Sequence, residues 1–193
     1  MADSLTLGSF GSTNSNPGVN NTAVTSSFGA TYNVGTGGIW HAPTGNSSWV
    51  ALNPGDGPGG GHYEKNGTYD FTTTFVLTDA SSDTGTLTVM ADDTTNVVLN
   101  GTEILSKAAY VAAAHCTKAQ PNCTMPITIS LAGLINGTNT LTFNEDQVYD
   151  NASGVDFSGS ITGVTPEPSS LLLLGSGLST MAGLAFRRRR VQA

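Results

Sequence analysis

The sequence predicts an all-β fold, an antiparallel β-sandwich, followed by a single C-terminal transmembrane helix. Charged residues make up only 11% of the 193 residues and glycine contributes 24, which suits turn-rich β structure better than a helical bundle. Apolar and polar residues alternate with period two in several segments, and no long amphipathic helix precedes Leu171. Asn-Gly pairs, which favour tight hairpin turns, lie between these segments. These three observations indicate short antiparallel strands.

Six segments carry the alternation in chain order. In the first, 71–77, the side chains of Phe71, Phe75 and Leu77 share one face with Thr73. The other predicted strands are 87–91, 97–99, 127–131, 141–143 and 155–161. The Asn-Gly pairs at 66–67, 100–101 and 136–137 predict type I′ turns, and 131–135 predicts one helical turn. The intervals 11–22 and 53–68 are rich in Gly, Pro, Asn and Ser and predict surface loops.

The C-terminus combines a Pro-Glu-Pro motif, an uncharged apolar stretch and an arginine cluster. These parts are Pro166, Glu167 and Pro168, the stretch 169–186, and Arg187, Arg188, Arg189 and Arg190. As a helix, 171–186 would be roughly 24 Å long, close to the roughly 30 Å hydrocarbon core once flanking residues are included. A buried core helix is the alternative, but four consecutive arginines need water or lipid headgroups. Clustered arginines stay cytoplasmic, so the folded part is expected across the membrane.

This tail resembles the PEP-CTERM sorting signal of Gram-negative bacteria, an element also named as an ice-binding protein C-terminal domain. The resemblance divides the chain into a β-sandwich domain, 1–164, and a sorting signal, 165–190. It implies that an exosortase-type enzyme recognises Pro166, Glu167 and Pro168 and removes the helix, which until then lies in the inner membrane. The protein would then reach the cell envelope or the extracellular matrix. The name of the tail does not imply ice binding.

Parts of the predicted sandwich are similar to galactose-binding-like jelly rolls. The similar segments are 85–93 with 97–101, and 137–143, and the resemblance spans about 69–164. It implies a jelly-roll body, while the ligand of such a body depends on its site rather than on its fold.

Export requires a signal peptide with a basic and an apolar region, and residues 1–16 contain neither. Either the protein is cytoplasmic or the true start lies upstream. We expect the second, because Ala2-Asp3-Ser4 suits a mature chain that follows an Ala-x-Ala cleavage site.

The charge distribution argues against nucleic-acid binding. Residues 1–165 contain three lysines, no arginine and thirteen acidic residues. A surface this acidic repels a phosphate backbone, so we expect no nucleic-acid partner.

Cys116 and Cys123 are the only cysteines and lie in a polar segment with Pro121. In an oxidising compartment we expect a disulfide, worth roughly 2–3 kcal/mol in the chain-entropy model. The alternative is a redox or metal site, for which His115 is the only obvious neighbouring ligand.

Several acidic clusters suggest a structural calcium ion, for which jelly-roll modules offer a precedent, and no other cofactor is expected. We assign this ion to Asp92 and Asp93. The other clusters are Asp79 with Asp83, and Glu145, Asp146 and Asp150 with Asp156. None has the EF-hand spacing, and solvated turn acids are the alternative.

Trp40, Trp49 and Tyr63 lie in a loop-rich region with His41 and His62. Aromatic faces stack on sugar C–H groups, so these three aromatics form the predicted carbohydrate site. The alternative is that the two tryptophans build the core.

Catalytic motifs are weak. Carboxylate pairs are common in any Asp-rich chain, so they do not by themselves indicate a glycosidase. The nucleophile motif Gly-x-Ser-x-Gly is absent from the sequence. The Gly-rich segment 55–61 lacks the Lys-Ser/Thr residues of a phosphate-binding loop and predicts a flexible loop. We therefore expect a non-enzymatic exported protein that binds carbohydrate. A secreted polysaccharide-acting hydrolase and a purely structural matrix protein are the alternatives.

Overall fold

The structure, a computed structural model, describes residues 4–9, 16–45, 47–109, 116, 120–148 and 150–163. The predicted Pro-Glu-Pro motif, the transmembrane helix 169–186 and the arginine cluster 187–190 lie outside these residues. Within the described part of the chain, no helix has both the length and the apolar character that a membrane crossing requires.

The described residues form eleven β-strands and no helix, which confirms the all-β prediction. The strands are β1 (Ser4–Gly8), β2 (Asn20–Ser26), β3 (Gly29–Val34), β4 (Trp49–Ala51), β5 (Gly67–Leu77), β6 (Asp83–Asp92), β7 (Thr94–Leu99), β8 (Thr102–Leu105), β9 (Ile127–Ser130), β10 (Gly137–Gln147) and β11 (Gly154–Gly163). Five of the six segments predicted from period two lie wholly in strands, in β5, β6, β7, β10 and β11, and the sixth, 127–131, ends one residue after β9.

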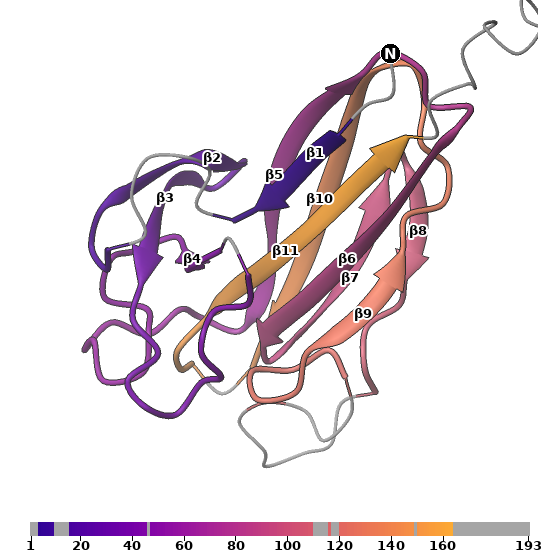
Figure 1. Cartoon of the computed structure of the whole chain (residues 1–193). Helices are drawn as coiled ribbons and strands as arrows, with labels where there is room; N and C mark the ends of the chain where they lie inside the picture. The colour runs from indigo at the N-terminus through magenta and orange to yellow at the C-terminus, as the bar shows by residue number, and fades with distance from the viewer. Residues whose placement is uncertain are drawn as a thin grey trace, which may run out of the picture.

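The strands form two antiparallel layers. One layer contains β9, β6 and β11, and the second edge of β11 pairs with β1 along 158–162 and with β4 at Val155. The other layer contains β8, β7, β10 and β5. Figure 1 shows β11 crossing in front of β10. On one side β2 connects the layers, because it pairs with β3 and also with β5 through Thr25 and Thr72.

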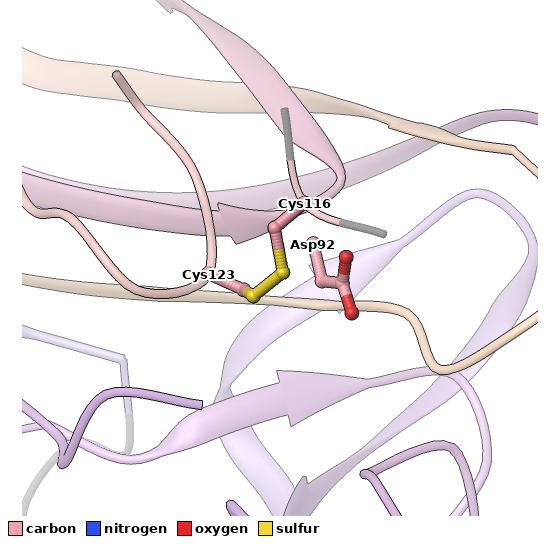
Figure 2. A group of neighbouring side chains, drawn as sticks. All are labelled: Asp92, Cys116 and Cys123. Atoms are coloured by element: carbon pink, nitrogen blue, oxygen red, sulfur yellow. A yellow bond between two sulfur atoms is a disulfide. The ribbon is translucent and has the colours of Figure 1, made fainter. Parts of the chain in front are cut away.

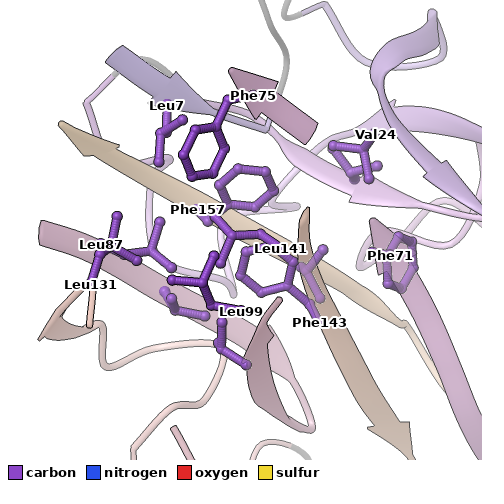
Figure 3. Packing of buried hydrophobic residues seen from close by; sticks show 14 of the residues in the cluster. Leu7, Val24, Phe71, Phe75, Leu87, Leu99, Leu131, Leu141, Phe143 and Phe157 are labelled. Atoms are coloured by element: carbon purple, nitrogen blue, oxygen red, sulfur yellow. The ribbon is translucent and has the colours of Figure 1, made fainter. Parts of the chain in front are cut away.

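Large apolar side chains fill the space between the layers (Figure 3). Phe143 of β10 stacks on Phe157 of β11, with ring centroids 4.4 Å apart, and Phe71 of β5 is equally buried. Successive residues of a strand face opposite sides, so the alternation in the sequence sends these side chains inward. Burial of one such side chain contributes roughly 1.5–3 kcal/mol, and the alternating positions therefore hold the layers together.

One of the three predicted Asn-Gly turns is a two-residue hairpin. Asn100 and Gly101 connect β7 to β8 with φ values of 51° and 83°, both positive as a type I′ turn requires. The other two predictions are wrong, because the glycines of 66–67 and 136–137 are already the first residues of β5 and β10. Both of those strands follow irregular segments, so no tight hairpin forms there.

The helical turn predicted at 131–135 is also wrong, because this segment is irregular. The side chain of Asn139 accepts a hydrogen bond from the Ile135 N–H (2.9 Å) and donates one to the Ile135 carbonyl (2.7 Å). A side chain that satisfies backbone groups in this way replaces the hydrogen bonds that a helical turn would supply.

The four N-terminal strands were not predicted. Residues 20–22 of the predicted loop 11–22 begin β2, and residues 67–68 of the predicted loop 53–68 begin β5. In β2 only Val24 is a buried apolar residue, at 1% exposure. Such a strand lacks the alternation on which the prediction depended, and tertiary pairing decides its conformation.

Candidate functional site

A groove opens between β1, β2 and β5, and threonines are the most frequent residue type along its walls. Its volume is about 450 Å³. The threonines are Thr6 of β1, Thr22 and Thr25 of β2, and Thr72, Thr73 and Thr74 of β5. Leu5, Ala23 and Phe75 add apolar surface. Beside the groove, β2 and β5 pair only through Thr25 and Thr72. The volume of the groove lies in the range of about 300–1,000 Å³ that is typical of small-molecule sites.

The two tryptophans of the predicted carbohydrate site are buried. Trp40 is 5% exposed and Trp49 is fully buried, and their ring centroids lie 4.3 Å apart. The indole N–H of Trp40 donates to Asp92 Oδ2 (2.7 Å), and that of Trp49 donates to the carbonyl of His41 (2.9 Å). Neither ring offers a face to a sugar, so the prediction is wrong for both, and the core alternative holds. Tyr63 is 52% exposed and stays accessible.

Cys116 and Cys123 form a disulfide, with Cα atoms 5.5 Å apart, as the sequence predicted. Figure 2 shows the carboxylate of Asp92 beside this disulfide. Although Asp92 and the two sulfur atoms lie within 4.8 Å of one another, sulfurs joined in a disulfide are not thiolates and do not act as metal ligands. The alternative of a redox or metal site at the cysteines is therefore not supported.

The predicted calcium pair Asp92 and Asp93 is buried, at 4% and 2% exposure. Asp93 accepts backbone N–H groups from Cys116 (2.8 Å) and Val148 (2.9 Å), and Asp92 accepts the Trp40 indole. At least three of the four carboxylate oxygens thus already accept a hydrogen bond. Burial, and after it the charge of Asp93, raises the pKa of Asp92 to about 8. A calcium ion at this pair stays a prediction.

The structure does not gather the predicted cluster of Glu145, Asp146, Asp150 and Asp156 around one point. Glu145 faces inward and is fully buried, while its neighbour Asp146 faces outward and pairs with Lys107 (2.6 Å). Burial raises the pKa of Glu145 well above its usual value, and it raises the pKa of Asp156 to about 7. Asp150 lies at the surface beside Lys65 (3.5 Å). Period-two alternation separates acids that are adjacent in the sequence.

One group of chemically reactive side chains was not predicted from the sequence. Asp56, His62 and Glu64 converge in the Gly-rich segment 53–66, with one ligand atom of each within 4.8 Å of the others. Burial raises the pKa of Asp56 to about 6, against the lowering effect of its hydrogen bond with His62. The sequence signal of this group is the spacing Asp-x5-His-x-Glu, which lies in a Gly-rich segment that predicts a surface loop.

Comparison with known proteins identifies the tail. Residues 164–190 match the PEP-CTERM protein-sorting motif, so the chain is a β-sandwich protein that carries this sorting motif. The motif indicates an exported protein of the cell envelope. No curated protein matches the chain.

Similar solved structures include three carbohydrate-binding modules of family 35. The module from Paenibacillus barcinonensis is 15% identical with a TM-score of 0.40, over 83% of this chain and 99% of the module. The module from Clostridium thermocellum is 14% identical with a TM-score of 0.37, over 63% and 82%. The module of Abf62 from Cellvibrio japonicus is 14% identical with a TM-score of 0.30, over 66% and 79%. Similarity at this level assigns no ligand to this chain.

Proposed function

We propose that this chain is a non-enzymatic, exported cell-surface or matrix protein whose jelly-roll body binds carbohydrate. In this proposal an exosortase-type enzyme processes the sorting motif, and the hydrophobic span 169–186 holds the chain in the inner membrane until then. The observation that carries the carbohydrate part is the threonine-lined groove between β1, β2 and β5.

Two observations support export. The sorting motif occupies 164–190, and Cys116 and Cys123 form a disulfide. Disulfides persist in the periplasm and outside the cell, whereas cytosolic thiols are kept reduced. Both observations therefore agree with a protein that leaves the cytoplasm.

The groove has the chemistry that a sugar requires. Each threonine hydroxyl both donates and accepts a hydrogen bond, as each sugar hydroxyl does. The apolar side chains of Leu5, Ala23 and Phe75 supply contact surface for the C–H face of a sugar ring. The acidic surface of the body disfavours a polyanionic ligand, so we expect neutral polysaccharides to bind more tightly than sulfated or phosphorylated ones.

Affinity electrophoresis and pull-down on purified exopolysaccharide test this proposal with the full chain in mild detergent. The double variant Thr22→Val, Thr73→Val removes two groove hydroxyls at nearly constant volume. We expect it to bind about tenfold more weakly or worse, because each lost hydrogen bond costs roughly 0.5–1.5 kcal/mol. The matched control is Thr88→Val, Thr128→Val, which removes a hydroxyl pair bonded to each other on a different, exposed surface (2.8 Å).

Other outcomes decide between the remaining functions. Loss of binding in Tyr63→Ala, with the groove variant unaffected, would move the site to the exposed tyrosine. Release of reducing ends from the polysaccharide would support the hydrolase. Absence of binding to every glycan on an array, by a folded wild-type chain, would favour the structural matrix protein.

A further inference from the structure

Backbone hydrogen bonds and close glycine contacts hold the segment 53–66, between β4 and β5, in one conformation. The Asp56 N–H donates to the carbonyl of Asn53 (3.1 Å), and the His62 N–H donates to the carbonyl of Gly55 (3.1 Å). A Cβ atom at Gly57 would lie 2.4 Å from the carbonyl oxygen of Gly35, so the close contact of these backbones requires glycine. A Cβ atom at Gly60 would likewise lie 2.4 Å from the carbonyl oxygen of Gly55, so glycine allows the loop to fold back and bring His62 to Asp56.

Contacts with the segment that precedes β11 hold the same loop from outside. The Glu64 N–H donates to the carbonyl of Asn151 (3.1 Å), and the Ser153 N–H donates to the carbonyl of Asp56 (3.2 Å). Both ends of the cluster are therefore fixed to the body of the sandwich. A site that is fixed through backbone bonds keeps its geometry without a ligand.

Three side chains converge in this loop. His62 Nδ1 contacts Asp56 Oδ1, and the same nitrogen lies 4.0 Å from Glu64 Oε1. The second oxygen of Asp56 accepts the Asn53 N–H (2.7 Å), which orients the carboxylate toward His62. Asp56 is fully buried, while the side chain of His62 is 46% exposed and that of Glu64 is 17% exposed. The cluster thus has a buried inner side and an open outer side.

We infer that Asp56, His62 and Glu64 form a binding site for a divalent transition-metal ion such as Zn²⁺. This inference goes beyond the proposed carbohydrate function and does not depend on it. The ion takes the place of the proton between His62 Nδ1 and Asp56 Oδ1, and Glu64 Oε1 becomes the third ligand.

Zinc binding requires the hydrogen-bonded pair His62 Nδ1 and Asp56 Oδ1 to move apart and the carboxylate of Glu64 to move closer to His62. Ligand atoms of tetrahedral Zn²⁺ lie about 3.4 Å apart, because each bond is about 2.1 Å long. The 4.0 Å between His62 Nδ1 and Glu64 Oε1 therefore shortens by about half an ångström on binding, within the reach of a glutamate side chain. The open side at His62 leaves the fourth position to water or to an external ligand.

The donor set selects the class of metal. One imidazole nitrogen with two carboxylate oxygens suits zinc and its first-row neighbours, whereas calcium takes six to eight oxygens. The adjacent cation Lys65 does not neutralise the cluster, because its Nζ lies beside Asp150 (3.5 Å) and its side chain is 82% exposed. Two carboxylates with one imidazole thus favour a divalent cation.

Zinc titration of the metal-stripped full chain, in mild detergent and with a tag free of histidine, tests the site. Competition with a chromogenic chelator measures affinity and stoichiometry, and Co²⁺ absorption reports the coordination geometry. We expect about one ion per chain, with tetrahedral Co²⁺ bands. His62→Ala and Glu64→Gln should each weaken binding by at least about tenfold and remove or alter these bands.

The control variant is His41→Ala. His41 is an exposed histidine outside the cluster, with Nδ1 in contact with the Ala42 carbonyl (2.6 Å), and its loss should leave zinc binding unchanged. Thermal unfolding without metal verifies the fold of each variant, and Glu64→Gln decides the matter if His62→Ala does not fold. Wild-type affinity in both cluster variants overturns the inference. No zinc binding by the wild type also overturns it and leaves an Asp56–His62 ion pair only.

Discussion

The buried carboxyl group of Asp92 makes the stability of the fold depend on pH. Burial raises the pKa of Asp92 to about 8 from 3.8, and the neighbouring Asp93 contributes to this increase. Asp92 holds a proton in the folded chain, because its carboxyl group is buried beside the charge of Asp93. The folded chain therefore keeps a proton that the unfolded chain loses above about pH 4.

The sign and size of the effect follow from this difference. The stabilisation is fully present below the unfolded pKa and is lost as the pH rises through the folded pKa, so stability falls between about pH 4 and 8. One group of this kind contributes about 1.4 kcal/mol per pH unit inside this window. From about pH 5 to 7, Asp92 alone lowers the free energy of unfolding by roughly 2–3 kcal/mol.

Asp92→Asn tests this reasoning. Asparagine keeps an oxygen that accepts the Trp40 indole N–H, but it does not ionise. Urea unfolding of the full chain in detergent, between about pH 5 and 8, should show a variant profile flatter by about 1.4 kcal/mol per pH unit. The reasoning is refuted if the variant profile is as steep as that of the wild type, or if wild-type stability rises over this range.

Glu103→Gln is the control for the loss of a carboxylate. Glu103 accepts hydrogen bonds from Ser106 and Asn96, which lower its pKa below its usual value. It therefore titrates below the window in question, and its replacement should leave the pH 5–8 profile unchanged.

Three further predictions concern stability. In urea unfolding, Phe143→Ala should lower the free energy of unfolding by roughly 3–5 kcal/mol, whereas Ile135→Ala, at an exposed position, should change it little. Equal effects of the two variants would contradict the assignment of Phe143 to the core. Replacement of Cys116 and Cys123 by serine should cost roughly 2–3 kcal/mol, and an unchanged urea midpoint would mean that the crosslink does not constrain the unfolded chain. Gly57→Ala places a Cβ atom against the carbonyl oxygen of Gly35, so we expect it to lower the free energy of unfolding by roughly 1–3 kcal/mol and to weaken zinc binding. A variant with wild-type stability and wild-type zinc affinity would contradict the described loop.

The strands that build the core were predictable because each carries its own signal. Phe143 of β10 and Phe157 of β11 occupy alternating positions whose apolar side chains have to face inward. The turn at Asn100 and Gly101 was predictable for a similar local reason, since a positive φ is inexpensive there. By contrast, β2 is polar along most of its length, and only its pairing with β3 and β5 gives it strand conformation.

The site was less predictable, because tertiary contacts decide which side chains are accessible. Trp40 and Trp49 lie in a Gly- and Pro-rich region that is typical of surface loops, yet they pack on each other and on the end of β6. The threonine groove combines β1 and β2 with β5, which begins 41 positions after the end of β2. No short segment of the sequence contains all the residues that line this groove.

The sequence by itself determined the sorting tail, the all-β body and the pairing of the two cysteines. Each of these depends on residues that are neighbours in the chain or, for the cysteines, have no other partner. Only the tertiary structure decided which acids are buried, which aromatics are covered and where Asp56, His62 and Glu64 meet. The physical reason is that solvent exposure and the electrostatic environment of a side chain depend on residues from distant strands.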